Sequence, residues 1–305
     1  MRIGVSVRST YALDDPRDGA RWMVERAAAA RDAGLDSLFV GDHHATGPFA
    51  YYQNTPIMGR MLAEWGDATA GVLMLLPLWH PVAAAEQLGT LASIAAGPFV
   101  LQCALGGGEQ QFAAMGMSQR HRVAHFEQGL DIIRRLLAGE EVTTNDGPYR
   151  IQAGRVAPLP PEPLEVWIGA SAPKAIDRAA RLGDGWLANA DAVPSEAAEQ
   201  AAAYRDACVA HGRAPGVIAI RRDVHVGADA DDAERVAGPV VAAGYRGFRP
   251  DAITFGSVDQ VVERFRTYAE MGYTDVIVRH LAEDQGEVLA SLERMGAVRE
   301  ALAGA

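Results

Sequence analysis

The chain of 305 residues is poor in cysteine and has no long apolar stretch. Its two cysteines, Cys103 and Cys208, are too few for a disulfide framework and suit a reducing compartment, so we expect a cytoplasmic protein. The longest unbroken apolar stretch, Gly71 to Trp79, is far below the roughly 20 residues that a membrane span requires. The N-terminal segment MRIGVSV has no basic leader, and we expect neither a signal peptide nor a membrane segment.

Basic residues are also scarce. The chain has 28 Lys and Arg against 39 Asp and Glu, a net charge of −11, and Lys174 is its only lysine. This charge repels nucleic acid and anionic membranes, so we expect neither as a partner, but the charge alone identifies no ligand. The 49% hydrophobic and 22% charged residues suit a large buried core and exclude disordered and fibrous classes.

Short apolar runs alternate with stretches of helical spacing, a pattern typical of a parallel sheet covered by helices. The predicted strands are Ile3 to Val7, Ser37 to Val40, Ala70 to Leu76, Phe99 to Leu105, Leu164 to Ile168, Gly185 to Ala188, Val217 to Val226 and Asp275 to Val278. The predicted helices include Ala20 to Ala33, Pro81 to Ala95, Arg122 to Leu137, Pro173 to Leu182 and Val258 to Met271.

A weak internal repeat of helix, glycine, short polar step and strand surrounds Gly34, Gly183 and Gly272. Glycine tolerates the left-handed conformation in which a helix ends and turns back. The repeat favours an α/β fold, a (β/α)8 TIM barrel in one domain, 1–305, with functional groups at the C-terminal ends of its strands. The alternative, an open doubly wound sheet, would normally show G-x-G-x-x-G after the first strand, and this chain does not.

Two segments interrupt the alternation, and we expect both to be insertions at the C-terminal mouth of the barrel. The first contains a predicted hairpin, Val142 to Val156, turned at Asn145, Asp146 and Gly147. The second, 245–256, has no clear periodicity and is predicted to be a long loop, since loops of this length are commonly binding lids.

The second predicted strand runs into Asp42, His43 and His44. At the catalytic face of a barrel, histidine can move a proton near neutral pH. An aspartate that caps the next turn beside two hydrogen-bonded histidines is the alternative. Metal binding is less favoured, because adjacent histidines splay apart and no second ligand pair follows, so we expect no metal.

Two further strand ends carry candidate ligand groups. Gly106, Gly107 and Gly108 would let the backbone approach a ligand closely, and Glu109 would donate a proton or cap the following helix. After the fifth strand, Gly169, Ala170 and Ser171 precede Pro173 at a predicted helix start, where free amides suit a phosphate. A serine that merely caps this helix is the alternative.

In this order and spacing, the segments resemble the bacterial luciferase-like family of flavin and deazaflavin oxidoreductases over nearly the whole chain. The matching pieces are AGLDSLFVGDHH, GVLMLLPLWHPVAAAEQLGTL, GGGEQQF, RVAPLPP, EVWIGASAPKAIDRAARLGDGW and GSVDQVVERFRTYAEMGYTDVIV. The resemblance implies a TIM barrel that holds coenzyme F420 or FMN at its mouth, and a homodimer.

The resemblance also implies roles for single residues. Asp42 and His43 would lie beside the ring, with His43 transferring a proton, and His44 resembles the second histidine of the luciferase branch. A non-proline cis peptide would join Val72 and Leu73, or lie one residue earlier. Gly106, Gly107 and Gly108 would border the ring, and Gly169, Ala170 and Ser171 would hold the phosphate. Glu109 lies about two positions later than the acid of the branch that oxidises sugar phosphates.

The function that the resemblance implies is hydride transfer between F420 and a small organic substrate. The alternatives are an FMNH2-dependent monooxygenase that uses O2 and a non-catalytic flavin-binding subunit. Apolar groups expected to line the pocket are Tyr11, Phe49, Tyr51, Trp79 and Phe248.

Overall fold

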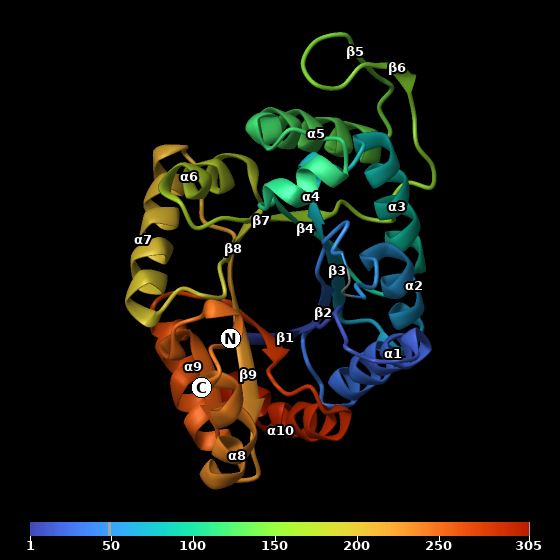
Figure 1. Ribbon diagram of the computed structural model, residues 1–305. Coiled ribbons are helices and arrows are strands. Elements are labelled where there is room, and N and C mark those ends of the chain that lie inside the picture. The colour runs from blue at the N-terminus through green and yellow to red at the C-terminus, as the bar shows by residue number, and fades with distance from the viewer. Residues whose placement is uncertain (48–49, 305) are drawn as a thin grey trace.

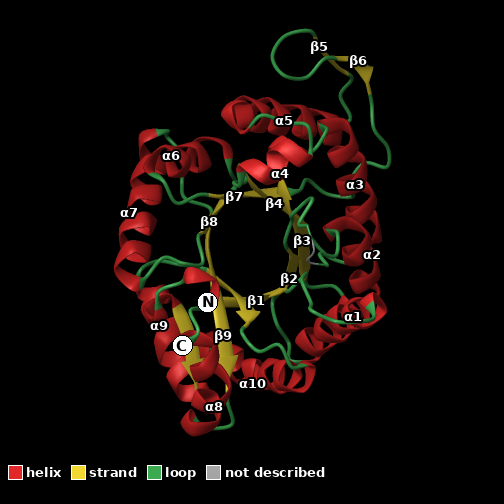
Figure 2. Cartoon of the chain, viewed as in Figure 1, coloured by secondary structure: helices red, strands yellow, loops and turns green. Residues whose placement is uncertain are grey.

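The computed structural model describes residues 1–47 and 50–304. In this part of the chain, eight parallel strands form a closed ring, visible end-on in Figure 2. The strand β1 pairs with both β2 and β11, and β8 pairs with β9, so that no edge remains in the ring. The predicted (β/α)8 TIM barrel is confirmed. Its strands are β1 (Arg2–Val7), β2 (Ser37–Val40), β3 (Thr69–Leu75), β4 (Phe99–Ala104), β7 (Glu165–Gly169), β8 (Gly185–Ala188), β9 (Val217–Val226) and β11 (Asp275–His280).

Helices surround the ring on its outside (Figure 1). The capping side chains at their starts include Asp15, Ser257 and Asp284, each of which accepts a backbone N–H of the first turn. Within the described residues, no helix has the length and apolar character needed to cross a membrane. The helices are α1 (Pro16–Asp32), α2 (Asn54–Trp65), α3 (Pro81–Ile94), α4 (Glu109–Ala114), α5 (Arg122–Leu137), α6 (Pro173–Leu182), α7 (Pro194–Ala210), α8 (Ala230–Ala242), α9 (Val258–Glu270) and α10 (Gln285–Ala303).

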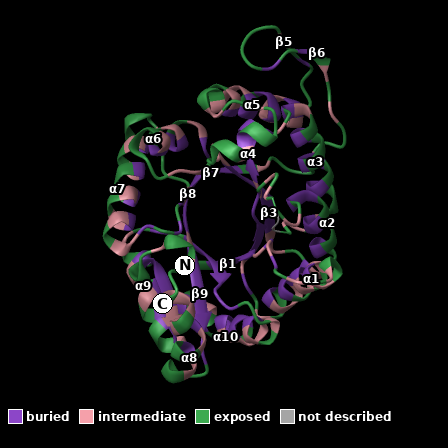
Figure 3. Ribbon diagram, viewed as in Figure 1, coloured by how far each residue is buried: buried purple, intermediate pink, exposed green. Residues whose placement is uncertain are grey.

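Alternate residues of each strand point into the barrel and out to the helices. The barrel interior is filled by a buried cluster, and a larger core lies between the strands and the inner faces of the helices, so burial in Figure 3 concentrates in the ring. The interior is therefore a packed floor beneath the mouth. The interior cluster consists of Phe39, Val100, Trp167, Ala219 and Ile277.

The predicted hairpin is present as β5 (Val142–Thr144) and β6 (Ile151–Gly154). It packs through Val142 and Ile151 against side chains of α3 and α5, at the periphery in Figure 1. Its expected place at the mouth is therefore wrong, because these apolar side chains anchor it on the outside of the barrel.

The segment 245–256 is only partly the loop that we expect. It contains two single-turn 3-10 helices, Tyr245–Gly247 and Pro250–Ala252, and then the strand β10 (Ile253–Gly256), which pairs in parallel with the end of β9. Residues 217–220 of β9 pair with β8, and residues 223–226 extend beyond β8. The backbone groups of this extension pair with β10, which explains why the segment forms a strand. The first of the two turns borders the barrel mouth.

Candidate active site

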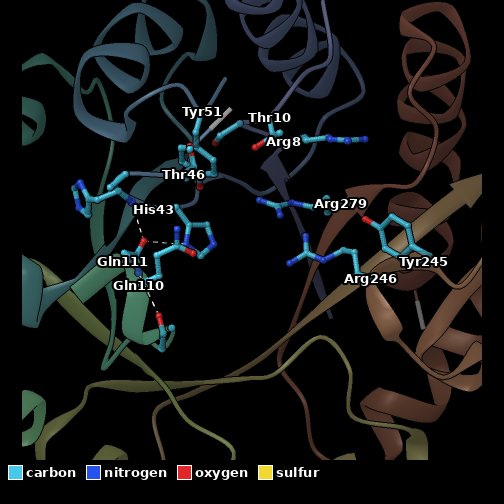
Figure 4. Close-up of a pocket in the computed structure, with 16 residues that line it drawn as sticks. Arg8, Thr10, His43, Thr46, Tyr51, Gln110, Gln111, Tyr245, Arg246 and Arg279 are labelled. Carbon is cyan, nitrogen blue, oxygen red and sulfur yellow. Dashed lines mark hydrogen bonds between the residues drawn. The ribbon is translucent and has the colours of Figure 1, made fainter. Parts of the chain in front are cut away.

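A cavity of about 640 Å³ opens at the C-terminal ends of the strands, within the ~300 to 1,000 Å³ range of small-molecule sites. It is lined from the ends of β1, β2 and β11, from the residues around the start of α4 and from the turn after α8 (Figure 4). The lining residues are Arg8, Ser9, Thr10, His43, His44, Ala45, Thr46, Gly47, Tyr51, Gly107, Gly108, Gln110, Gln111, Tyr245, Arg246 and Arg279.

His43 follows the end of β2, and its imidazole faces into the cavity (Figure 4). The ring packs edge-on against Tyr51, with the two ring centroids 5.3 Å apart. Desolvation by the surrounding protein lowers the pKa of His43 below its ordinary value of 6.5, although the hydrogen bond with Gln111 opposes this effect. His43 is therefore neutral at pH 7 and able to accept a proton.

Gln111 determines which nitrogen of His43 is free. Its Nε2 donates to the carbonyl of Gly107 at 3.3 Å, and its Oε1 accepts the backbone N–H of His44 at 2.8 Å. Oε1 also lies 3.4 Å from Nδ1 of His43. Because Oε1 can only accept, Nδ1 carries the proton of the neutral ring, and Nε2 presents its lone pair to the cavity.

Asp42 is buried, with 1% of its surface exposed. Its Oδ2 accepts the backbone N–H of Leu75 at 2.8 Å and the indole N–H of Trp79 at 2.9 Å. Nε2 of His44 lies 3.2 Å from its Oδ1. Asp42 therefore ties the end of β2 to the end of β3, and it is not among the lining residues, whereas His44 is.

The glycine turn after β4 is only partly at the cavity. Gly107 and Gly108 line it, and a Cβ atom at either position would meet nothing within 4 Å, so the turn leaves an open wall. Gly106 instead lies against Leu75. Glu109 is exposed at the start of α4 and does not line the cavity, whereas Gln111, two residues later, does.

The predicted non-proline cis peptide between Val72 and Leu73, or one residue earlier, is wrong. Within the described residues the cis peptide is Ala157–Pro158. The strand β3 keeps an unbroken register with β4, in which Val72 pairs with Leu101 and Leu73 with Gln102, so the backbone stays extended there. Val72 points into the core outside the barrel, so its side chain does not reach the mouth.

The turn from β7 to α6 presents free amides, as a phosphate site requires. Pro173 is the first residue of α6, and the N–H groups of Ser171 and Ala172 have no hydrogen-bond partner in the described chain. The N–H of Ala170 donates to Leu187, so this amide is already engaged. Ser171 is exposed and does not cap the helix, which excludes the alternative of a capping serine.

The predicted aromatic lining is correct only in part. Tyr51 lines the cavity, Tyr11 is buried beside Trp22, and Trp79 is turned toward Asp42. Phe248 packs behind the wall of the cavity in a small cluster with Tyr245. Phe49 lies outside the described residues.

Three arginines at the cavity were missed by sequence reasoning: Arg8, Arg246 and Arg279. Arg8 and Arg279 each follow the apolar part of a barrel strand, so their position at a strand end was the available signal. Arg246 has a left-handed backbone, with φ of 51°, in the turn after α8, which the sequence does not indicate.

The site suits a flat ring that carries a phosphate. The open wall at Gly107 and Gly108 would accommodate the ring. The free amides of Ser171 and Ala172 do not line this cavity, but they lie at another strand end of the same barrel face, where they would bind the phosphate. Among the described residues, no group of three or more His, Cys, Asp or Glu side chains is placed to hold a metal ion.

The chain has clear relatives. Residues 1–252 match the sequence model of the luciferase-like monooxygenase family. An F420-dependent glucose-6-phosphate dehydrogenase of Nakamurella multipartita is 26% identical, with 93% of this chain and 94% of the relative covered.

Solved structures share the fold. An F420-dependent secondary alcohol dehydrogenase bound to an F420–acetone adduct superposes with a TM-score of 0.80 and 18% identity, over 99% of this chain and 98% of that one. The FMN-bound oxygenating constituent of 3,6-diketocamphane monooxygenase from Pseudomonas putida superposes with a TM-score of 0.84 and 17% identity, over 97% and 96%.

Proposed function

Because this chain belongs to the luciferase-like monooxygenase family, we propose that it is an oxidoreductase that transfers a hydride between the deazaflavin F420 and a small organic substrate. The F420-dependent relatives support the cofactor. The observation that carries the proposal is His43, a neutral imidazole whose free Nε2 faces a cavity with an open glycine wall.

The residues that would hold the cofactor lie on neighbouring strand ends. Gly107 and Gly108 would contact the ring, and the amides of Ser171 and Ala172 would bind the phosphate. The bound deazaflavin supplies hydride exchange at C5 of its ring, and the protein supplies orientation and electrostatics.

His43 would handle the proton that accompanies the hydride. When a substrate alcohol is oxidised, its hydroxyl loses a proton to Nε2 of His43 while its carbon loses the hydride, and a carbonyl forms. Gln111 keeps Nδ1 protonated, so Nε2 stays the accepting atom. In the reverse direction the protonated imidazole donates to the carbonyl oxygen.

A cofactor titration tests this function. F420 and FMN are each titrated onto the protein while the quenching of their fluorescence is followed. We expect F420 to bind at least about tenfold more tightly, a difference of about 1.4 kcal/mol. No binding of F420 under conditions where FMN binds would refute the proposal.

An FMNH2-dependent monooxygenase is the second candidate, and the close superposition on an FMN-bound monooxygenase favours it. The two functions differ in oxygen handling, because a 5-deazaflavin reacts poorly with O2. Stopped-flow oxidation of each reduced cofactor on the protein separates them. If neither reduced cofactor reacts with any substrate or with O2, the chain is a non-catalytic flavin-binding subunit.

We also propose a cytoplasmic homodimer. Both cysteines are buried and free, which suits a reducing compartment. Large apolar side chains are exposed on the helices, including Ile94 and Val209, and twofold dimers are the commonest oligomers. Light scattering at micromolar concentrations should give twice the 32.4 kDa mass of the chain.

A further inference from the structure

The wall of the cavity opposite His43 carries two guanidinium groups, those of Arg246 and Arg279, which project toward the imidazole (Figure 4). The side chain of Arg279 is nine-tenths buried, and its Nε has no hydrogen-bond partner in the described chain. Leaving a buried cation unpaired is costly, so a bound anion is the expected complement.

Two carboxylates on the strands and loops that form this wall, Asp223 and Glu283, are already paired. Asp223 is the cross-strand neighbour of Arg279, but it forms an ion pair with Arg221 at 3.0 Å and accepts the hydroxyl of Tyr245 at 2.8 Å. Arg8 is paired with Glu283 at 3.0 Å. In the described part of the chain, the guanidinium groups of Arg246 and Arg279 have no ion-pair partner, although the whole chain carries a net charge of −11.

The position of Arg279 relates this charge to the reaction. A Cβ atom placed on Gly41 would lie 3.4 Å from Nη2 of Arg279, so the guanidinium reaches across the mouth to the end of β2, two residues before His43. Any group bound there lies beside the atom that exchanges the proton. This favours an anionic group of the reactant over a remote phosphate on the tail of a cofactor.

Arg246 is held toward the cavity by its backbone. Its φ of 51° lies in the left-handed region, between Gly244 and Gly247, which also have positive φ. Its guanidinium lies 5.4 Å from the ring centroid of Phe248. Strained backbone of this kind concentrates at ligand sites.

Resting on the function proposed above, we propose that Arg246 and Arg279 bind a carboxylate or phosphate of the substrate and thereby place the carbon that exchanges the hydride beside His43. The substrate is then a small anion that also carries a hydroxyl or carbonyl group, and both groups fit into the cavity together. The guanidinium groups of Arg246 and Arg279 lie on one wall, so they can donate hydrogen bonds to two oxygens of one anionic group.

Anion binding without cofactor is the first test. Inorganic phosphate and malonate are titrated onto the unliganded protein while the midpoint of thermal unfolding is followed. We expect both anions to stabilise the parent, and Arg279→Gln and Arg246→Gln each to weaken anion binding at least about tenfold. Arg279→Lys should recover part of the affinity. Arg246→Gln alters an exposed side chain, so its folding is not at risk.

Arg249→Gln is the matched control. It removes one positive charge from the same segment, but Arg249 pairs with Glu196 and does not line the cavity. We expect its anion affinity to equal that of the parent. Equal losses in all three glutamine variants, or no loss in any of them, would overturn the proposal.

The second test separates substrate from cofactor as the source of the anion. F420 affinity is measured on the same variants, and turnover is compared for 3-hydroxybutyrate against its methyl ester and for glucose 6-phosphate against glucose. We expect F420 affinity to change less than about threefold, and at least one anion to be used in preference to its neutral analogue, with that preference lost in Arg279→Gln. If F420 affinity falls while anion binding does not, the arginines serve the cofactor and the proposal is overturned. Arginine-dependent phosphate binding by a protein that does not bind F420 would support the anion site while refuting the proposed function.

Discussion

The indole N–H of Trp79 donates a hydrogen bond of 2.9 Å to Oδ2 of Asp42, and this contact ties the loop after β3 to the strand end that carries His43. Trp79 therefore helps to fix the position of this strand end. Asp42 is a buried carboxylate whose Oδ2 has one other donor, the backbone N–H of Leu75.

Replacement of Trp79 should consequently cost stability. Trp79→Phe keeps an aromatic ring but removes a hydrogen bond to a charged acceptor, and such bonds contribute about 1.5 to 3 kcal/mol. We expect the free energy of unfolding in urea to fall by about that amount. Trp22→Phe is the control, since the indole N–H of Trp22 makes no hydrogen bond in the described chain. Equal losses in the two variants would show that the Asp42 bond contributes nothing.

His43 should matter for turnover more than for cofactor affinity. His43→Asn keeps a hydrogen-bonding side chain but cannot carry the proton at neutral pH, and a general acid or base typically contributes about 100- to 10,000-fold in rate. We expect kcat to fall by that factor and the affinity for F420 to change by less than about tenfold. His44→Asn should be milder under F420 chemistry and comparably severe under luciferase-like oxygen chemistry. If both variants turn over at near-parent rates, neither histidine moves a proton.

The pH profile should report the state of His43. Because the pKa of His43 is lowered below 6.5, most of the imidazole is still neutral at pH 6.5. The acid limb of kcat/KM for alcohol oxidation should therefore lie below pH 6.5. Gln111→Glu would place a carboxylate against Nδ1, stabilise the imidazolium and move this limb to higher pH by about one unit or more.

Gln110→Glu is the matched control for Gln111→Glu. It adds the same charge at the cavity from the neighbouring position, but Gln110 makes no hydrogen bond to His43. Equal shifts in the two variants would mean that charge alone acts and that Gln111 does not fix the tautomer.

The strand ends were predictable, and contacts across the mouth were not. The apolar runs of the barrel strands located His43 at the mouth because a strand buried on both faces leaves a continuous sequence pattern. Gln111 is a polar residue on a short helix, and only the closed ring brings it beside His43. Arg279 directly follows the predicted strand that ends at Val278, but only the structure shows that β11 continues to His280 and that the guanidinium reaches Gly41 at the end of β2.

Helix α7 was not among the helices named from the sequence. Its alanine-rich sequence gives little contrast between a buried and an exposed face, although Ala197, Ala201 and Tyr204 are buried against the barrel. That contrast is strong in the amphipathic helix α6 and weak in α7.

The phosphate site can be tested at Ser171. Ser171→Asp should abolish binding of F420 and FMN with the fold intact, because a carboxylate at the start of α6 would repel the phosphate through the amides that attract it. Fluorescence titration measures the affinity, and circular dichroism checks the fold. Lys174→Gln is a control for the altered charge, as Lys174 is exposed one residue inside the helix. Parent-like affinity in Ser171→Asp would place the phosphate elsewhere.

His280 should make the fold sensitive to acid. It is almost fully buried at the end of β11, and burial lowers its pKa from 6.5 to about 3. The unfolded chain therefore binds a proton at His280 that the folded chain does not, at any pH between about 3 and 6.5. The free energy of unfolding should fall as the pH drops below 6.5, by about 1.4 kcal/mol per pH unit from this group and by at most about 5 kcal/mol in all. His280→Gln cannot titrate, so its stability relative to the parent should improve by about 2 kcal/mol between pH 7 and pH 5 in urea unfolding. His121→Gln is the control, because His121 is exposed on the surface and its replacement should leave the pH dependence unchanged. If His280→Gln and the parent lose stability in parallel over this range, the buried imidazole is not the origin of the acid sensitivity.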